Sequence, residues 1–146
     1  MRINGEWLVC DDGIIRPVLQ GFVQLADGSW KGLVLLLDGG ADRTVLSADF
    51  LNPLQPLAME EAEITSLAGV GGIAESITVE TAISFMKDDG RRVAVRGPLS
   101  VFTEMGSADL SVLGRDVTNN FSVIYDYPSR TVTLLAAPHS YEVKSS

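Results

Sequence analysis

Asp38 is the residue of this sequence best placed to do chemistry. It directly follows the apolar run Val34–Leu37 and is followed by Gly39 and Gly40, which carry no side chains. A carboxylate held at the end of a buried strand can act on a water molecule when its pKa suits the task. Glycines beside it permit unusual backbone angles and let a substrate backbone approach closely. The plainer interpretation is a turn, because Asp-Gly is a common turn pair.

The other side chains that often carry out catalysis are scarce. Cys10 is the only cysteine and His139 is the only histidine, and they lie near opposite ends of the chain. One cysteine excludes an internal disulfide and a cysteine metal cluster, and one histidine excludes a histidine-rich zinc site. A catalytic serine or cysteine normally needs a histidine as its base, so an enzyme of that kind is disfavoured.

Length and composition indicate one globular domain. The chain has 146 residues, of which 46% are hydrophobic and 21% are charged, and this suits a protein with a sizeable core. The net charge of −8 disfavours nucleic-acid binding, which needs a basic face to displace counterions. No apolar run approaches the length of about 18 residues needed to span a membrane, and the N-terminal segment lacks the apolar core of a signal peptide. We expect a cytoplasmic protein with no nucleic-acid or membrane partner.

The order of apolar runs and turn residues predicts an all-β domain with one or two short helices. Asp27-Gly28 and Asp89-Gly90 are typical hairpin turns, and β-forming residues flank each of them. A short helix is expected over Ala48–Leu54, with Ser47 as its cap and Pro53 as its end. The strands expected from these patterns are Arg16–Leu25, Lys31–Leu37, Glu63–Leu67, Ser76–Phe85, Arg91–Gly97, Phe121–Tyr125 and Thr131–Leu135.

Asp38 also belongs to a series of three motifs. The motifs are Leu36-Leu37-Asp38-Gly39-Gly40-Ala41-Asp42-Arg43-Thr44, then Gly69-Val70-Gly71-Gly72-Ile73, then Val112-Leu113-Gly114-Arg115-Asp116. They resemble, in this order, the active-site loop, the glycine-rich flap tip and the hydrophobic-hydrophobic-Gly-Arg motif of the retropepsin-like aspartic proteases. Each motif alone is common, whereas all three in this order within one β domain are specific. The resemblance implies a closed or partly open β-barrel of the retropepsin type.

The resemblance assigns roles to residues of all three motifs. Asp38 would be the catalytic residue, and Asp42 would pair with Arg115 beneath the active-site loop, where a planar guanidinium can meet a carboxylate bidentately. The flap hairpin would fold over a bound peptide and donate backbone hydrogen bonds. The residues expected to contact substrate are Gly40, Ala41, Asp42, Val70, Gly71 and Gly72. The residues expected to support the active-site loop are Gly39, Thr44, Gly114 and Arg115.

The chain carries one active-site motif, whereas aspartic proteases use two carboxylates that share a proton. The resemblance therefore implies a homodimer in which two Asp38 residues meet on a two-fold axis and cleave a peptide or protein substrate without a cofactor. Asp116 and Asp126 are not expected to supply the second carboxylate, because neither lies in a matching loop. We expect Asp116 at a helix start and Asp126 in a turn.

The resemblance also suggests how the chain is divided. The retropepsin-like domain would span residues 16–135, after an N-terminal extension or edge strand over residues 1–15 and before a C-terminal tail over residues 136–146. Terminal strands often form the dimer interface in this family, and Thr131–Ala137 is the expected interface strand here.

Gly39 departs from the family pattern, which has Thr or Ser after the catalytic aspartate. In the family, that hydroxyl forms a hydrogen bond to the loop of the partner chain. Gly39 removes two such bonds from a dimer, a loss on the order of 2 kcal/mol. The sequence therefore supports two functions. One is an aspartic-type endopeptidase with an Asp38/Asp38 dyad, and the other is a catalytically weak or inactive module that binds peptides or dimerises.

Overall fold

In the computed structural model of the chain, residues 1–59, 65–69, 72–104, 110–140 and 142–144 are described, and most of them lie in strands. The strands are β1 (Arg2–Val9), β2 (Ile15–Gln24), β3 (Trp30–Leu37), β4 (Val45–Leu46), β5 (Thr65–Gly69), β6 (Gly72–Met86), β7 (Arg92–Phe102), β8 (Ser111–Leu113), β9 (Phe121–Asp126) and β10 (Thr131–Ala136). The helices among these residues are α1 (Leu51–Leu54) and α2 (Arg115–Thr118), and α1 is flanked by 3-10 turns at Ala48–Phe50 and Gln55–Leu57. The predicted β domain with short helices is confirmed.

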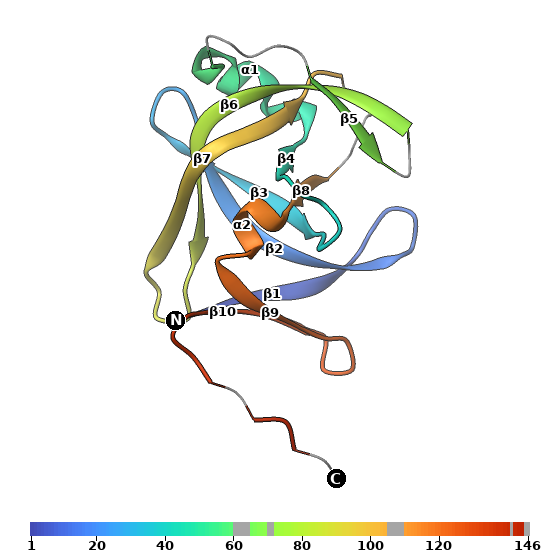
Figure 1. Cartoon of the computed structure of the whole chain (residues 1–146), viewed down its shortest axis with the longest axis vertical. Helices are drawn as coiled ribbons and strands as arrows, with labels where there is room; N and C mark the ends of the chain where they lie inside the picture. The colour runs from blue at the N-terminus through green and yellow to red at the C-terminus, as the bar shows by residue number, and fades with distance from the viewer. Residues whose placement is uncertain (60–64, 70–71, 105–109, 141, 145–146) are drawn as a thin grey trace.

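The strands form one continuous sheet that turns back on itself (Figure 1). Its order is β5-β6-β7-β4-β8-β3-β2-β1-β10-β9, and β6 also pairs with β2. That additional pairing joins Phe22 to Ser84 and Val23 to Ile83. As a result β2, β3, β8, β4, β7 and β6 close into a ring, and this ring is the observed counterpart of the predicted barrel.

The hydrophobic core fills the ring, because alternate side chains of each strand point to the same face. In β3, Leu33, Leu35 and Leu37 are buried, whereas the residues between them are partly exposed. Val132 and Leu134 of β10 are buried in the same way. Further core side chains come from β2, β6 and β7, namely Leu19, Val23, Val79, Ile83, Phe85, Leu99 and Val101. The strand that ends at Asp38 is thus anchored in the core by one of its faces.

β1 lies inside the sheet rather than at its edge, with β2 on one side and β10 on the other. This corrects the expectation of an edge strand over residues 1–15. The physical reason is close packing: Ile3 is buried, and a Cβ added at Gly5 would lie 2.5 Å from the Val18 carbonyl oxygen. β10 is in turn flanked by β1 and β9, so β9 and not Thr131–Ala137 is the strand at this end of the sheet.

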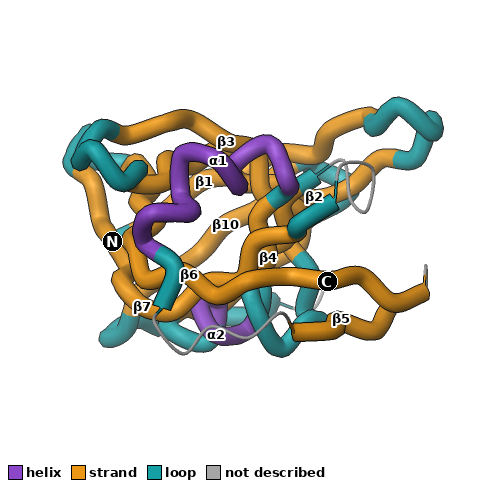
Figure 2. Tube along the Cα trace, turned by 90° about the horizontal axis from the view of Figure 1, so that it is seen from above, coloured by secondary structure: helices purple, strands orange, loops and turns teal. Residues whose placement is uncertain are grey.

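The segment after β4 is helical for longer than predicted, because the first 3-10 turn, α1 and the second 3-10 turn follow one another directly. Pro53 lies within α1 rather than ending it. It occupies the third helical position, where the backbone N–H would have no partner within the helix in any case. Ser47 forms no side-chain capping bond; its amide instead donates to Ser111 Oγ at 3.0 Å. Figure 2 shows α1 and α2 on opposite sides of the strands.

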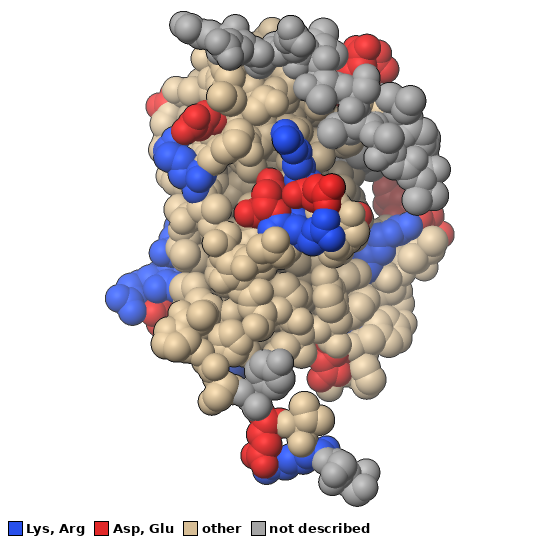
Figure 3. All heavy atoms as spheres, viewed as in Figure 1, with Lys and Arg blue, Asp and Glu red and all other residues tan. Residues whose placement is uncertain are grey.

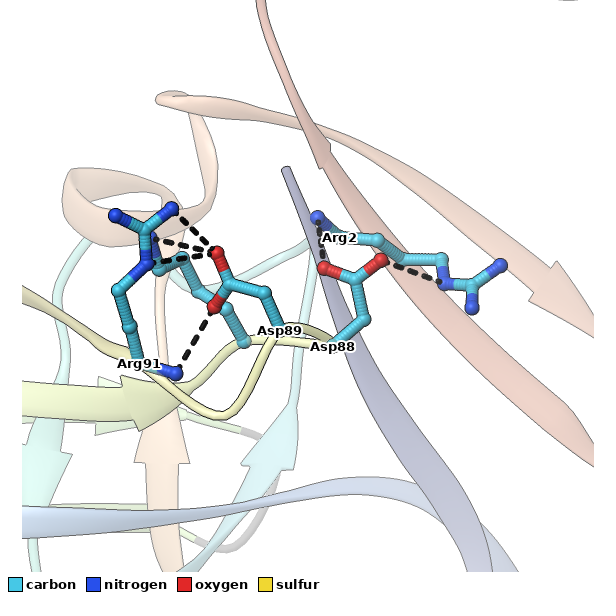
Figure 4. A network of polar contacts seen from close by, with 5 residues as sticks. Arg2, Asp88, Asp89 and Arg91 are labelled. Carbon is cyan, nitrogen blue, oxygen red and sulfur yellow. Dashed lines mark hydrogen bonds and ion pairs between the residues drawn. The ribbon is translucent and has the colours of Figure 1, made fainter.

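Both predicted Asp-Gly hairpin turns are confirmed. Gly28 and Gly90 have φ angles of 86° and 81°, which glycine adopts without steric cost. The second turn also contacts β1 (Figure 4): Asp88 accepts a hydrogen bond from the Arg2 amide at 3.3 Å and pairs with the Arg2 guanidinium at 3.8 Å. Next to it, Asp89 pairs with Arg91 at 2.8 Å. These contacts fasten the long β6–β7 hairpin to the N-terminal strand.

Acid should weaken the second turn. Hydrogen bonds from Arg91 lower the pKa of Asp89 from 3.8 to about 2. Because the folded pKa lies below the ordinary one, the stabilisation is fully present above about pH 4 and is lost as the pH falls toward about 2. The effect is small, because Asp89 is exposed. Urea unfolding midpoints of wild type and Asp89→Asn should converge over this pH range, whereas a constant difference would contradict the prediction.

Candidate active site

Asp38 directly follows β3 and is exposed at its end. β3 pairs in parallel with β8, and Leu37 lies opposite Leu113. The Asp38 amide donates to the Leu113 carbonyl oxygen at 3.2 Å and so continues this pairing beyond the strand. The Asp38 carboxylate accepts a hydrogen bond from the Gly40 amide at 2.9 Å. A strand anchored in the core therefore presents a carboxylate whose orientation is held by its own loop.

The active-site loop crosses the chain after β8 at Gly114. A Cβ added at Gly114 would lie 2.4 Å from the Arg43 carbonyl carbon and 2.5 Å from its oxygen, so a larger residue fits only if the backbone moves. The Gly114 amide donates to Thr44 Oγ1 at 3.0 Å. The next amide, that of Arg115, donates to the Ala41 carbonyl oxygen at 2.9 Å. Thr44 and Gly114, both expected to support the loop, thus lie in direct contact.

Asp116 makes the main polar contact beneath the loop, which the sequence did not indicate. Its carboxylate accepts hydrogen bonds from the Thr44 amide at 3.0 and 2.9 Å and from Thr44 Oγ1 at 2.7 Å. Asp116 does lie in the first turn of α2, as expected. The contact joins residues 72 positions apart, and no local pattern marks such a pair. Thr44 is fully buried, so these hydrogen bonds satisfy polar groups that water cannot reach.

Asp42 and Arg115 form the ion pair that the family resemblance implied. The pair does not lie beneath the loop, because the two side chains are 78% and 49% exposed. Figure 3 shows acidic and basic side chains gathered over α2, the helix that carries Arg115. Exposed ion pairs contribute little to stability. The loop is therefore held mainly by Thr44, Gly114 and Asp116.

An apolar hollow of about 440 Å³ opens beside the strand that carries Asp38. Leu36, Leu110 and Val112 contribute its apolar wall. Asp12 and Arg16 line it as well and form a bidentate pair, with N–O distances of 2.8 and 2.7 Å. The hydrogen bonds from Arg16 lower the pKa of Asp12 to about 2, so this carboxylate stays ionised in mild acid. The hollow combines residues from the N-terminal part of the chain with Leu36, Leu110 and Val112, which are far apart in the sequence, and this explains why sequence patterns did not indicate it.

Solved structures with this architecture exist, although no protein-family profile and no curated protein matches the sequence. EIAV protease, complexed with an inhibitor, is 28% identical over 71% of this chain and 86% of that chain, with a TM-score of 0.50. A retropepsin-like aspartic protease from Rickettsia conorii is 15% identical over 92% and 90% of the chains, with a TM-score of 0.56. The retroviral protease-like domain of Ddi1 from Leishmania major is 13% identical over 84% and 94%, with a TM-score of 0.52. This chain has a retropepsin-like fold.

The retropepsin-like fold brings the first and third motifs together, as the contacts of Thr44 with Gly114 and Asp116 show. The second motif lies in the hairpin of β5 and β6, where Gly69 pairs with Gly72. Val70 and Gly71 lie outside the described residues. The expected substrate contacts of the second motif therefore remain a prediction.

Tyr125 is a residue that sequence reasoning did not single out, although its pKa responds to the charge of Asp38. It lies on β9 and its side chain is half-exposed. Burial and, second, the negative charge of Asp38 raise the pKa of Tyr125. Nothing in the local sequence FSVIYD marks this tyrosine, because the register of β9 against β10 decides where it points.

The remaining reactive side chains lie apart from Asp38 in sequence. His139 Nε2 lies 2.7 Å from Ser122 Oγ, and Cys10 is a free thiol at the hollow. Asp126 is the last residue of β9, and the turn predicted to contain it begins directly after it; its carboxylate accepts a hydrogen bond from the Ser129 amide of that turn at 3.0 Å. Within the described residues, no three acidic, histidine or cysteine side chains form a group that could hold a metal ion. In that same part of the chain, no helix has the length and apolar character needed to cross a membrane.

Proposed function

We propose that this protein is an aspartic-type endopeptidase that hydrolyses peptide bonds as a homodimer. The observation that carries the proposal is the exposed Asp38 carboxylate, held at the end of β3 by the Gly40 amide within a retropepsin-like fold. Two of the similar structures are named as proteases, and one of these was solved with an inhibitor bound. The hydrogen bonds between Thr44 and Asp116 tie the loop that carries Asp38 to α2.

The chemistry follows from two Asp38 carboxyl groups that meet across a two-fold axis. Like charges at this range cannot both ionise cheaply, so the pair shares one proton. The ionised group takes a proton from water, whose oxygen bonds to the carbonyl carbon of the peptide. The protonated group donates its proton to the carbonyl oxygen. When the tetrahedral intermediate collapses, the C–N bond breaks and the leaving amine takes up the proton that came from water. One hydroxyl of the intermediate returns its proton to the ionised Asp38 as the C=O bond of the carboxyl product forms, which restores the shared proton of the pair.

β9 offers a surface for the second copy. It is the last strand at its end of the sheet, so among the described strands one of its edges has no neighbour. Ile124 and Tyr125 on this strand are 41% and 47% exposed. A two-fold symmetric contact places the same patch on both copies, so an exposed apolar edge can pair with its own equivalent. β9 therefore replaces Thr131–Ala137 as the proposed interface strand.

The hollow beside β3 suits an apolar side chain of the substrate. Leu36, which contributes to its wall, lies two residues before Asp38. Burial of one apolar side chain gains about 1.5–3 kcal/mol. The proposed substrates are therefore extended peptides with an apolar residue next to the bond that is cleaved.

An unfolded protein substrate tests the proposal. Wild type is incubated with it at acidic and at neutral pH, and the fragments are identified by mass spectrometry. Internal cleavage at a few sites is the expected result. Peptide binding or dimerisation without any fragments, at either pH, would contradict the proposal. It would indicate the catalytically inactive module that binds peptides or dimerises. The missing hydroxyl at Gly39 favours that alternative.

Gly39→Thr should strengthen the dimer. In the described part of the chain, a Cβ at Gly39 meets no atom within 4 Å, so a larger side chain fits. Two added hydroxyls that bond across the interface contribute about 2 kcal/mol, which lowers the dimer Kd about 30-fold. Sedimentation at decreasing protein concentration measures this change. Gly39→Val is the matched control, since valine has the shape of threonine without the hydroxyl; an equal gain for both variants, or none for threonine, would contradict the prediction.

A further inference from the structure

The outer face of β2, β6 and β7 carries Arg92 and Arg96. Both residues are exposed and lie on β7, two positions before and two positions after Ala94. Ala94 pairs with Ser84 of β6, which pairs in turn with Phe22 of β2. Alternate residues of a strand and directly paired residues of neighbouring strands point to one face, so these side chains share a surface. It is the surface opposite the core, because the residues on either side of Ser84 in the chain belong to the core.

Both arginines reach across β6 toward β2. The Cζ atom of Arg92 lies 4.0 Å from the centre of the Phe22 ring, and Arg96 Nη2 donates to Gln24 Oε1 at 2.7 Å. In the described part of the chain, neither guanidinium forms an ion pair with a carboxylate, whereas both aspartates of the β6–β7 turn are paired with arginines (Figure 4). The chain has a net charge of −8, so two neighbouring arginines without acidic partners form a local positive surface. An acidic ligand complements such a surface.

Ser84 lies opposite the point midway between the two arginines and has an unsatisfied hydroxyl. It is 1% exposed although it points away from the core, so the side chains around it cover it. Among the described residues, no group forms a hydrogen bond with its Oγ atom. A buried hydroxyl without a partner costs free energy, and buried polar groups in folded proteins rarely stay unpaired. A carboxylate that enters between the two arginines supplies the missing acceptor.

Exposed apolar side chains border the arginines on the same face. Met86 pairs with Arg92 across β6 and β7 and is 46% exposed. Trp30 of β3 pairs with Gln24 and is 37% exposed. Tryptophan, methionine and arginine are enriched where proteins bind one another, because they combine large contact areas with directed polar groups. The face can therefore contact apolar residues on either side of a bound carboxylate.

We propose that this outer face binds an acidic segment of a partner protein. One carboxylate of the segment lies between Arg92 and Arg96 and accepts a hydrogen bond from the Ser84 hydroxyl. Arginine suits this position because its planar group donates two parallel hydrogen bonds to a carboxylate. The Arg92 guanidinium keeps its N–H groups available, since it lies on a ring rather than against an acid. The inference does not depend on cleavage by Asp38.

A titration followed by nuclear magnetic resonance tests the inference. The protein is the 15N-labelled Asp38→Asn chain, which lacks the proposed catalytic group, so binding is measured apart from cleavage. The probe is the capped peptide GSLELSG, and its control is GSLQLSG, which has the same shape without the charge. The amide signals of residues 82–84 and 92–96 should shift with a saturable curve. The glutamine peptide should bind at least about 10-fold more weakly, because a hydrogen bond to a charged group is lost.

Variants in the same background locate the site. Arg92→Gln and Arg96→Gln should each weaken binding of the glutamate peptide about 10-fold, and Ser84→Ala should weaken it about fivefold. Arg130→Gln is the matched control, because the Arg130 Cζ atom also lies over a ring, that of Tyr127 at 3.9 Å, in the turn after β9. This variant removes the same charge and the same kind of ring contact elsewhere. It should bind the peptide as its parent does.

Three outcomes overturn the inference. The first is equal affinity for the glutamate and glutamine peptides. The second is unchanged binding in the variants of Arg92, Arg96 and Ser84, or an equal loss in Arg130→Gln. The third is a set of shifts confined to the residues around position 38. None of these results depends on whether wild type cleaves peptides, so the inference and the proposed function fail separately.

Discussion

Asp38→Asn should abolish peptide cleavage while the fold stays intact. An amide can neither take a proton from water nor hold one for the carbonyl oxygen, so the expected loss in kcat/KM is about 100- to 10,000-fold. In the wild-type chain, Asp38 accepts a hydrogen bond of 2.9 Å from the Gly40 amide. The side-chain oxygen of asparagine can accept the same hydrogen bond. The loop should therefore keep its conformation. Hydrolysis of a fluorogenic peptide measures activity, and thermal unfolding checks the fold.

The control for this variant is Asp49→Asn. Asp49 is also an exposed aspartate, and it lies in the 3-10 turn before α1. Its replacement makes the same change in charge at a distant position and should leave kcat/KM unchanged. Comparable cleavage by Asp38→Asn and wild type would mean that Asp38 is not the catalytic residue.

Gly114→Ala should have the largest effect on stability. The added methyl group would lie 2.4–2.8 Å from three backbone atoms of Arg43, so the active-site loop must move away. Overpacking of this kind costs about 1–3 kcal/mol, and the movement would also strain the hydrogen bonds of Thr44 with Gly114 and Asp116. A loss near 3 kcal/mol lowers Tm by about 6–12 °C in a domain of this size. Activity should fall as well, since Asp38 lies in the loop that must move and its amide bonds to Leu113, the residue before Gly114.

Gly97→Ala is the matched control for Gly114→Ala. Gly97 lies within β7, and a Cβ there meets no described atom within 4 Å. The same methyl group should therefore change Tm little at this position. Equal Tm values for the two alanine variants would contradict the close crossing of the loop at Gly114.

Features of the fold that depend on local chemistry could be predicted from the sequence. The Asp-Gly turns at Gly28 and Gly90 follow from the positive φ that each turn requires. The position of Asp38 at the end of a strand follows from the apolar run before it. Pro53 was expected to end the helix, because a proline in the interior of a helix breaks it. In the structure Pro53 lies in the first turn of α1, where a proline is tolerated. The error concerned the position of Pro53 within the helix.

Features that depend on contacts between distant segments could not be predicted. The Thr44–Asp116 contact spans 72 positions and exists only because the chain after β8 crosses the loop at Gly114. β1 lacks the apolar alternation of an inner strand, because Gly5 takes a core position where no side chain fits. In each case the deciding information is which segments become neighbours.

The measurement that tests the account most directly uses mixed dimers. Wild-type chains are unfolded and refolded together with increasing amounts of Asp38→Asn chains, and cleavage is measured per wild-type chain. If each active site needs Asp38 from both copies, mixed dimers are inactive, and activity per wild-type chain falls to about one half at equal amounts. It should then approach zero as the variant is added in excess. Activity per wild-type chain that stays constant at every ratio would contradict a shared Asp38/Asp38 dyad.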